Sequence, residues 1–307
     1  MKILVTGFSG MLGIDLVSEL LPYHDVCGIA NRETDKVKIP FQCIDITNRN
    51  AVFKVIGKFK PQVIIHTAAH VDADDCEKNP DHAYSINTQG TKWIADASVQ
   101  EKATLLFISS DYVFDGMKQD AYDETDQPNP RNVYGKSKML AENYLCEFNI
   151  GAYIIRPCWL FGENGPNFFR AILRKVARNE NLKVVDDQIG APTYTKDLSK
   201  VLRTIAEKAV AKNLKSGIQI YHVANNGKTS WFSAAKLIVS KVNSQVKLDP
   251  IPSTQLDRAA KRPNNSVFNM SKIKNDFGIV TRPWNEALED YWNQSLKREW
   301  KQLVKSA

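Results

Sequence analysis

Several features that mark other protein classes are missing from this 307-residue chain. No apolar run approaches the ~18 residues that a membrane-spanning helix needs. The few apolar residues before Gly7 are also too short a run for a secretory signal. The five cysteines form no C-x-x-C pair and are odd in number, which favours reduced thiols and disfavours zinc. We therefore expect a cytoplasmic protein with no membrane anchor and no metal.

Basic residues outnumber acidic ones, but they do not gather into a patch. The chain has 41 Lys and Arg against 34 Asp and Glu, a formal net charge of +7. These cations are spread along the sequence, and no basic run is interleaved with aromatic residues. Hydrophobic residues at 43% and charged residues at 24% are typical of globular proteins. The composition favours an anionic small-molecule substrate over nucleic acid.

Short apolar runs alternate with longer amphipathic stretches in the first half of the chain. Runs without polar alternation, separated by helices, are typical of parallel strands buried on both faces. The pattern predicts a doubly wound, Rossmann-like α/β sheet. The expected strands cover 3–6, 26–30, 41–46, 63–66, 104–108 and 152–156, and the expected helices cover 11–21, a stretch from 49, 80–100 and 132–148.

The pattern loosens after residue 156. We expect helices over 167–178, 195–211, 230–242 and 284–296 and a strand over 218–223. Proline clusters punctuate this part of the chain. The sequence predicts a dinucleotide-binding domain over 1–156. It predicts a smaller mixed α/β substrate lid over 157–307, interleaved with the last strands of the sheet.

A glycine-rich turn directly follows the first predicted strand and opens the first helix. Its spacing is G-x-x-G-x-x-G, and glycine lets the backbone approach a pyrophosphate without a Cβ clash. The N–H groups of the following helix then face the phosphates. We expect the turn to bind a dinucleotide through Gly7, Ser9, Gly10, Met11, Leu12 and Gly13.

The ends of the next strands extend this predicted cofactor site. A site that prefers NAD usually has a carboxylate after the second strand, whereas this chain has Asn31 and Arg32 there. A cation at that point suits a 2′-phosphate, so we expect NADPH, with NADH left open. The remaining predicted cofactor contacts are Asp45, Ile46, Thr67, Ala68 and Ala69.

Tyr134 and Lys138 are one helical turn apart on a predicted helix and share a face. A cation beside a tyrosine favours the phenolate, which would lower the tyrosine pKa for acid–base work. The lysine can also hold a nicotinamide ribose. Ser110 ends the fifth predicted strand at its carboxyl edge, where its hydroxyl can bond a substrate carbonyl oxygen. These residues predict a reductase site.

The chain resembles the extended short-chain dehydrogenase/reductases and, within them, the dTDP-4-dehydrorhamnose reductases. The matching segments are TGFSGMLG (6–13), HTAAHVDADDCEKNP (66–80), ISSDYVFDG (108–116), NVYGKSK (132–138), RPCWLFG (156–162), DQIGAPT (187–193) and RPNNS (262–266). The resemblance implies reduction of dTDP-4-dehydro-L-rhamnose to dTDP-L-rhamnose by NADPH, a step of nucleotide-sugar and polysaccharide biosynthesis. It implies Tyr134 as proton donor, with Ser110 and Lys138 completing the catalytic group. It also implies substrate contacts from Ser110, Asp111, Trp159, Asn167, Gln188 and Arg262.

Three alternatives stay open at this point. The regulatory β subunit of methionine adenosyltransferase resembles the same subgroup without acting as a sugar reductase, although Trp159 and DQIGAPT favour the enzyme. The substrate could also be another nucleotide-linked 4-keto sugar. Some relatives dimerise around Mg²⁺, and Asp15 matches one of their acidic positions. We expect Asp15 to be an exposed acid near the start of a helix, and a homodimer is left open.

Overall fold

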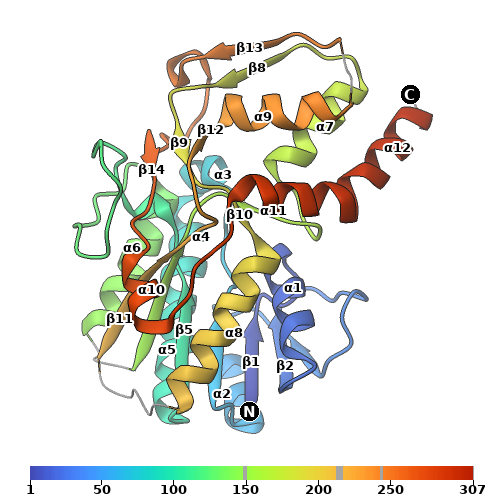
Figure 1. Ribbon diagram of the computed structural model, residues 1–307. Helices are drawn as coiled ribbons and strands as arrows, with labels where there is room; N and C mark the ends of the chain where they lie inside the picture. The colour runs from blue at the N-terminus through green and yellow to red at the C-terminus, as the bar shows by residue number, and fades with distance from the viewer. Residues whose placement is uncertain (148–150, 212–216, 243–244, 307) are drawn as a thin grey trace.

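The computed structural model describes residues 1–147, 151–211, 217–242 and 245–306. A seven-stranded parallel sheet lies at its centre, in the order β11-β6-β5-β4-β1-β2-β3 (Figure 1). This confirms the predicted doubly wound sheet. Its strands are β1 (Lys2–Thr6), β2 (Asp25–Ala30), β3 (Phe41–Cys43), β4 (Val63–His66), β5 (Thr104–Ile108), β6 (Ala152–Pro157) and β11 (Ile218–Val223).

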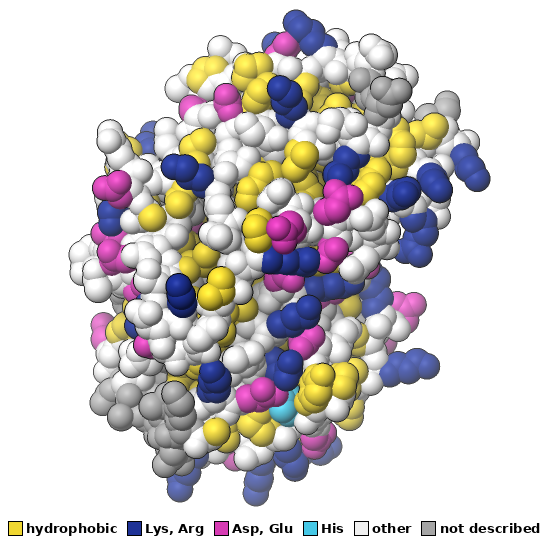
Figure 2. All heavy atoms as spheres, viewed as in Figure 1, with side chains coloured by type: hydrophobic (Ala, Val, Ile, Leu, Met, Phe, Trp, Pro, Cys, Tyr) yellow, Lys and Arg dark blue, Asp and Glu magenta, His cyan; other side chains and the backbone are white. Residues whose placement is uncertain are grey.

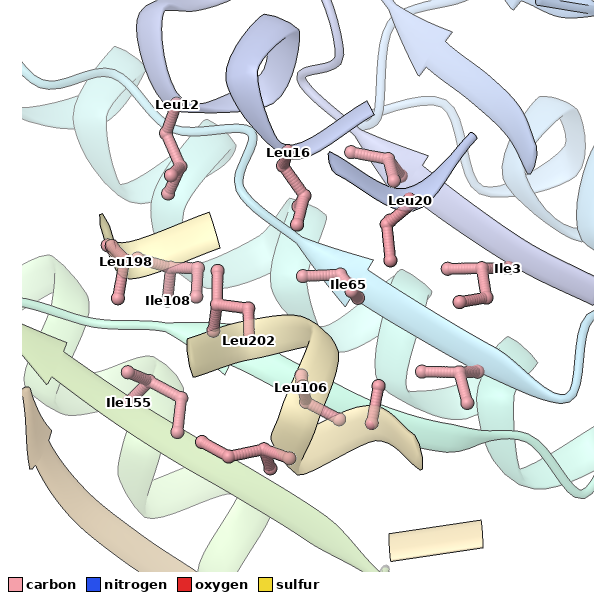
Figure 3. Packing of buried hydrophobic residues seen from close by; sticks show 14 of the residues in the cluster. Ile3, Leu12, Leu16, Leu20, Ile65, Leu106, Ile108, Ile155, Leu198 and Leu202 are labelled. Carbon is pink, nitrogen blue, oxygen red and sulfur yellow. The ribbon is translucent and has the colours of Figure 1, made fainter. Parts of the chain in front are cut away.

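Helices cover both faces of this sheet, and each strand sends alternate side chains to opposite faces. Ile3 and Val5 of β1 pack in the core beneath α1 (Met11–Leu20) and α8 (Thr195–Ala211). Leu4 between them packs on the other side, under α2 (Arg49–Phe59), α5 (Thr91–Gln100) and α6 (Val133–Glu147). Figure 3 shows the core between the sheet and the helices α1 and α8, where Leu16 and Leu202 point toward Ile65. Burial on both faces explains why the strands read as unbroken apolar runs.

Most of the second half of the chain, apart from α8, β11 and the helix after β14, builds a smaller layer above the carboxyl ends of the strands (Figure 1). It has its own apolar core, formed by several helices and one strand pair. The helices are α7 (Phe168–Ala177), α9 (Trp231–Val239), α11 (Trp284–Tyr291) and α12 (Lys297–Ser306), and the strands are β8 (Leu182–Val185) and β13 (Leu248–Ile251).

Several two-residue strands join this layer to the main sheet. β7 (Leu160–Phe161) pairs with β10 (Thr193–Tyr194), and β9 (Ile189–Gly190) pairs with both β12 (Thr229–Ser230) and β14 (Asn265–Ser266). Their pairing brings segments more than 70 residues apart together above the sheet.

The structure departs from the predicted elements at a few points. β3 ends at Cys43 rather than at residue 46, because Ile46 leaves the sheet and packs against Gly90. The predicted helix over 80–100 divides into α4 (Pro80–Tyr84), a π-helical turn at Ser85–Gly90, and α5. Two short helices, α3 (Ala73–Lys78) and α10 (Ser271–Phe277), were not predicted.

Three other predicted helices differ from the structure mainly at their ends. The helix expected over 230–242 becomes α9 followed by a 3₁₀ turn, and the one expected over 284–296 continues through a π-helical turn into α12. The last residue of the helix expected over 132–148 lies outside the described residues.

Acidic and basic side chains are interspersed over the face seen in Figure 2. Blue side chains lie on many parts of this face, and α12 carries Lys297, Arg298, Lys301 and Lys305. Within the described ranges, no helix is both long and apolar enough to cross a membrane.

Candidate active site

The glycine turn between β1 and α1 leaves room for a phosphate. Gly7 has a positive φ of 70°, and its N–H donates to the carbonyl of Ile29 at 2.6 Å. A Cβ on Gly7 would lie 2.7 Å from the backbone nitrogen of Ala68, and one on Gly13 only 2.2 Å from the Gly7 carbonyl oxygen. Gly10 caps α1 without a side-chain hydrogen bond, and the first turn of α1 has no acidic residue. The uncapped, unneutralised helix start fits an anion such as a dinucleotide pyrophosphate.

The other predicted cofactor contacts follow the carboxyl ends of neighbouring strands. Asn31 and Arg32 come directly after β2, and both are exposed. Thr67 follows β4, and its hydroxyl donates to the Thr6 carbonyl at 2.7 Å. Asp45 is exposed beyond β3, whereas Ile46 is buried. The structure therefore places all of these residues along one edge of the sheet, beside the glycine turn.

Ser110, Tyr134 and Asp111 meet beyond the end of β5. The Ser110 hydroxyl donates to Asp111 Oδ1 at 3.1 Å and accepts from the Tyr112 N–H at 3.2 Å. Tyr134 packs edge-on against Tyr112, with ring centroids 5.5 Å apart. Burial raises the Tyr134 pKa and Asp111 raises it further, while the Ser110 side chain opposes the rise. The expected lowering of the Tyr134 pKa by Lys138 is therefore wrong for this structure: burial raises that pKa, and Lys138 is not among the groups that shift it.

Lys138 is only 1% exposed, one turn after Tyr134 on α6. Its ammonium lies 4.1 Å from the centroid of the Phe107 ring. Burial lowers the Lys138 pKa to about 7, and the Glu142 carboxylate opposes that fall. Glu142 is itself bound to the buried Arg156 guanidinium by hydrogen bonds of 3.0 and 2.6 Å. Among the residues that the structure describes, the buried Lys138 ammonium therefore has no dedicated counter-ion.

Asp111 is 3% exposed, and burial raises its pKa to about 6. The hydroxyls of Ser266 and Ser110 oppose that rise. Within the described part of the chain, Asp111 Oδ2 and the Ser109 hydroxyl are buried without a hydrogen-bond partner. Such orphaned polar atoms are costly unless a ligand or water completes them. Both lie at the strand edge where a substrate would enter.

Trp159 stands in the left-handed region of backbone conformation, at φ 46°. Its ring stacks on Trp231 with centroids 3.6 Å apart and planes 11° apart. Phe168 continues the aromatic group, 4.4 Å from Trp231. A Cβ on Gly190 would lie 2.6 Å from the Trp159 ring, so glycine in DQIGAPT makes room for it. Trp231 was not singled out in the sequence, because no motif contains it.

The remaining predicted substrate contacts already have partners within the chain. Arg262 binds the Asp74 carboxylate through two nitrogens, at 2.8 and 3.2 Å. The Gln188 side chain donates to the Ser253 hydroxyl at 2.8 Å. Asn167 accepts from the Arg170 N–H at 3.2 Å and so caps α7. The ion pair of Asp74 with Arg262 was not predicted, since the two residues are far apart in the sequence and only the fold brings them together.

The expectation that Asp15 is exposed is wrong. It is 6% exposed, and it accepts hydrogen bonds from Asn164 at 2.9 Å and from Thr195 at 2.5 Å. Burial raises its pKa. The chain turns Asp15 inward because α1 packs closely on α8, where Thr195 is the first residue. Across the described ranges, no three His, Cys, Asp or Glu side chains are grouped to hold a metal ion.

Comparison with known proteins places the chain in a family. A family model described as "RmlD substrate binding domain" matches residues 1–297. A dTDP-4-dehydrorhamnose reductase of Aggregatibacter actinomycetemcomitans is 38% identical over 296 residues, which cover 94% of this chain and 97% of that protein. This chain belongs to the dTDP-4-dehydrorhamnose reductase family. Another relative is the spore coat polysaccharide biosynthesis protein SpsK of Bacillus subtilis, 33% identical over 94% of this chain and 96% of its own length.

Solved structures of the reductase family agree with the fold. The dTDP-4-dehydrorhamnose reductase of Bacillus anthracis, solved in complex with NADP, superposes with a TM-score of 0.86 at 34% identity. The match covers 96% of this chain and 99% of that one. UDP-glucose 4-epimerase of Thermotoga maritima reaches a TM-score of 0.79 at 17% identity, over 92% of this chain and 94% of its own. At that identity, the epimerase shows only that the two share a fold.

Proposed function

We propose that this chain reduces the C4 ketone of dTDP-4-dehydro-L-rhamnose to dTDP-L-rhamnose, with NADPH as the reductant. The meeting of Tyr134, Ser110 and Asp111 at the end of β5 is the observation that carries the proposal, since Asp111 Oδ2 has no hydrogen-bond partner among the described residues. The names of the relatives, and the NADP bound to one of them, support it. A proton donor beside a hydroxyl that can bond the reacting oxygen suits carbonyl reduction.

The catalytic work of the chain itself is to hold and deliver a proton. Burial keeps the Tyr134 phenol protonated at neutral pH, so it donates its proton to the C4 oxygen as negative charge develops there. The Ser110 hydroxyl stabilises the same oxygen by a hydrogen bond. Lys138, buried one turn away, supplies positive charge to the nicotinamide ribose and to the reacting region. When bound, NADPH supplies the hydride.

The glycine turn and the strand ends would hold that cofactor. The pyrophosphate fits the start of α1 between Gly7 and Gly13, where no side chain caps the helix. Arg32, exposed after β2, would bind the 2′-phosphate. Thr67, Ala68 and Ala69 would line the cofactor from the end of β4.

The substrate would lie between the sheet edge and the smaller layer. Asp111 Oδ2 and Ser109 Oγ would meet the sugar hydroxyls, and Trp159 would pack against the sugar face. Arg262 would face the diphosphate. Since the side chain of Asn167 caps α7, we propose that Asn167 contributes to substrate binding by shaping the loop before that helix. This assignment also treats residues 157–307 as mainly a lid over the 1–156 domain, interleaved with the last strands of the sheet, since β11 lies in that sheet and α8 packs on it.

The alternatives predict different behaviour. A non-catalytic subunit like the methionine adenosyltransferase β subunit would bind NADPH without consuming it, whereas the aromatic group at Trp159 favours a sugar pocket. If the true substrate is another nucleotide-linked 4-keto sugar, the protein would reduce that sugar and not dTDP-4-dehydrorhamnose.

The five cysteines are free, which supports a cytoplasmic site of action. A homodimer stays a prediction.

The decisive experiment is NADPH oxidation with enzymatically generated dTDP-4-dehydrorhamnose, followed by absorbance, beside a parallel reaction with NADH. Rapid oxidation that yields dTDP-L-rhamnose is the expected result. If NADPH binds but is not oxidised, the assigned substrate is wrong, and trials with other keto sugars then separate the two alternatives.

A further inference from the structure

A segment without long helices or strands connects the smaller layer to the dinucleotide-binding part. We call residues 253–262 the strap. It follows β13 and leads to β14 (Figure 1). Its first residue is fastened to the smaller layer, because Ser253 donates to the Asp187 carboxylate through its hydroxyl at 2.6 Å and its N–H at 2.8 Å. Gln188 adds a bond to the same hydroxyl.

The far end of the strap is fastened to α3 by Asp74. This carboxylate accepts from Arg262 at 2.8 and 3.2 Å, from Arg258 at 3.0 Å and from the Ala260 N–H at 3.0 Å. These four bonds fill the roughly four acceptor positions of one carboxylate. The Asn132 amide adds a bond to the Lys261 carbonyl at 2.7 Å. Between the two ends, residues 254–259 are exposed.

Arg262 links this attachment to the reacting groups. Its guanidinium also interacts with the Tyr112 hydroxyl, and Tyr112 packs against Tyr134. Directly after it, Pro263 and Asn264 pass so close to Gly116 that a Cβ there would lie 2.4 Å from the Asn264 nitrogen. The strap therefore ends at the wall of the site that holds Tyr134.

The charges of this cluster do not cancel. Two guanidinium groups meet one carboxylate, whose pKa the arginines hold well below its usual range, so these three groups together carry one positive charge at neutral pH. The carboxylates of Asp72, Asp75 and Glu77 belong to the same short helix and its cap. Arg262 is the less exposed of the two arginines, with 21% of its side chain accessible against 57% for Arg258. A net cation held rigidly beside the site suits an anionic diphosphate.

We propose that Asp74 is a positioning residue for the substrate: by holding Arg262 and the strap against the site, it fixes the cation that receives the diphosphate of the nucleotide sugar. The proposal rests on the proposed function. Asp74 does not touch the substrate. It aligns Arg262 before binding, so the ordering of the strap does not oppose substrate association.

Asp74→Asn is the matched test, because it keeps the shape of the side chain and removes the charge. One of its two acceptor atoms becomes an NH₂ group that faces guanidinium N–H donors. Losing part of a charge-assisted bond should weaken binding of the nucleotide about tenfold. We expect KM for the sugar nucleotide and Kd for dTDP to rise together, with kcat within twofold of wild type and KM for NADPH unchanged.

Three companions make the result specific. Asp74→Glu keeps the charge one methylene further out, and we expect it to recover part of the dTDP affinity. Asp81→Asn removes an exposed carboxylate from neighbouring α4 and should leave both constants unchanged. Limited trypsin digestion reports on the strap itself: cleavage after Arg258 and Lys261 should be faster in Asp74→Asn, and dTDP should slow it in the wild-type protein.

Calorimetric titration with dTDP requires no turnover, so it tests the positioning role of Asp74 separately from the proposed reductase function. If wild type binds dTDP and turns over while Asp74→Asn does both equally well, the positioning role is refuted, even if trypsin cuts the strap faster. If wild type neither binds dTDP nor reduces the ketone, the proposed function is refuted, and this inference fails with it.

Discussion

The ammonium of Lys138 lies 4.1 Å from the centroid of the Phe107 ring, and Phe107 in turn stacks on His66. Burial lowers the His66 pKa to about 3, so that ring is neutral at physiological pH. Lys138 therefore packs against an aromatic ring that is backed by a neutral imidazole. The ring face gives it a weak attraction, and burial opposes its charge more strongly.

This arrangement predicts that the isolated protein is destabilised by Lys138. Its pKa is about 7 when folded and about 10.4 when unfolded. Between these values the unfolded chain binds more protons, so the free energy of unfolding rises with pH. Lys138→Met should therefore raise Tm by on the order of 5 °C at pH 6, and the gain should shrink toward pH 10.

Thermal unfolding followed by circular dichroism across that pH range checks this prediction. Lys136→Met, which changes an exposed lysine of the same helix, is the control and should show no such trend. A gain that is the same at pH 6 and pH 9 would show that Lys138 is not penalised for its charge.

Removing the Tyr134 hydroxyl should abolish most turnover without loosening the fold. Tyr134→Phe leaves the ring on Tyr112 in place but removes the hydroxyl proposed as the proton donor, so kcat should fall by about 10²–10⁴. NADPH affinity should change little. Steady-state kinetics and a fluorescence titration measure the two effects. Tyr144 lies elsewhere on α6, and its hydroxyl donates to Asp96 of α5. Tyr144→Phe removes that hydroxyl and should keep the wild-type kcat.

Arg32 should set the choice between the two nicotinamide cofactors. Losing a charge-assisted bond to the 2′-phosphate costs roughly 1.5–3 kcal/mol. Arg32→Ala should therefore lower the ratio of kcat/KM for NADPH to that for NADH by about one to two decades. Lys38→Ala changes an exposed cation further along the same loop and should leave the ratio intact. An unchanged ratio in Arg32→Ala would exclude Arg32 from the cofactor site.

Trp159 should matter for the sugar nucleotide and not for NADPH. Trp159→Ala breaks the stack on Trp231 and removes the surface proposed for the sugar, so KM for the substrate should rise about tenfold. Trp93→Ala, on α5 beside Arg49, is the control for loss of an indole elsewhere. A lower Tm with an unchanged substrate KM would assign Trp159 to packing alone.

Much of the cofactor half could be predicted because its signals are local. The glycine turn must follow a strand and open a helix, and the spacing of Tyr134 and Lys138 needs only a helix to place both on one face. β3 and the turn before α5 were misjudged, because Ile46 and Gly90 settle their geometry by packing against each other. No local pattern records such a contact.

The substrate half was less predictable. The motifs named Trp159 and Arg262, but their partners Trp231 and Asp74 are distant in sequence and belong to other elements. Asp15 was expected at the surface, because helix position alone does not show which neighbour will cover it. The packing of α1 against α8 buries it.

By itself, the sequence determined the parallel sheet, the glycine turn that opens α1 and the placement of Tyr134 and Lys138 one turn apart on a helix. These follow from residue spacing and from apolar runs, which the chain carries locally. Only the tertiary structure decided the electrostatics. Burial raises the Tyr134 pKa and lowers the Lys138 pKa, and among the described residues Asp111 Oδ2 is left without a hydrogen-bond partner. Desolvation depends on everything packed around a group, and that environment exists only after distant segments have come together.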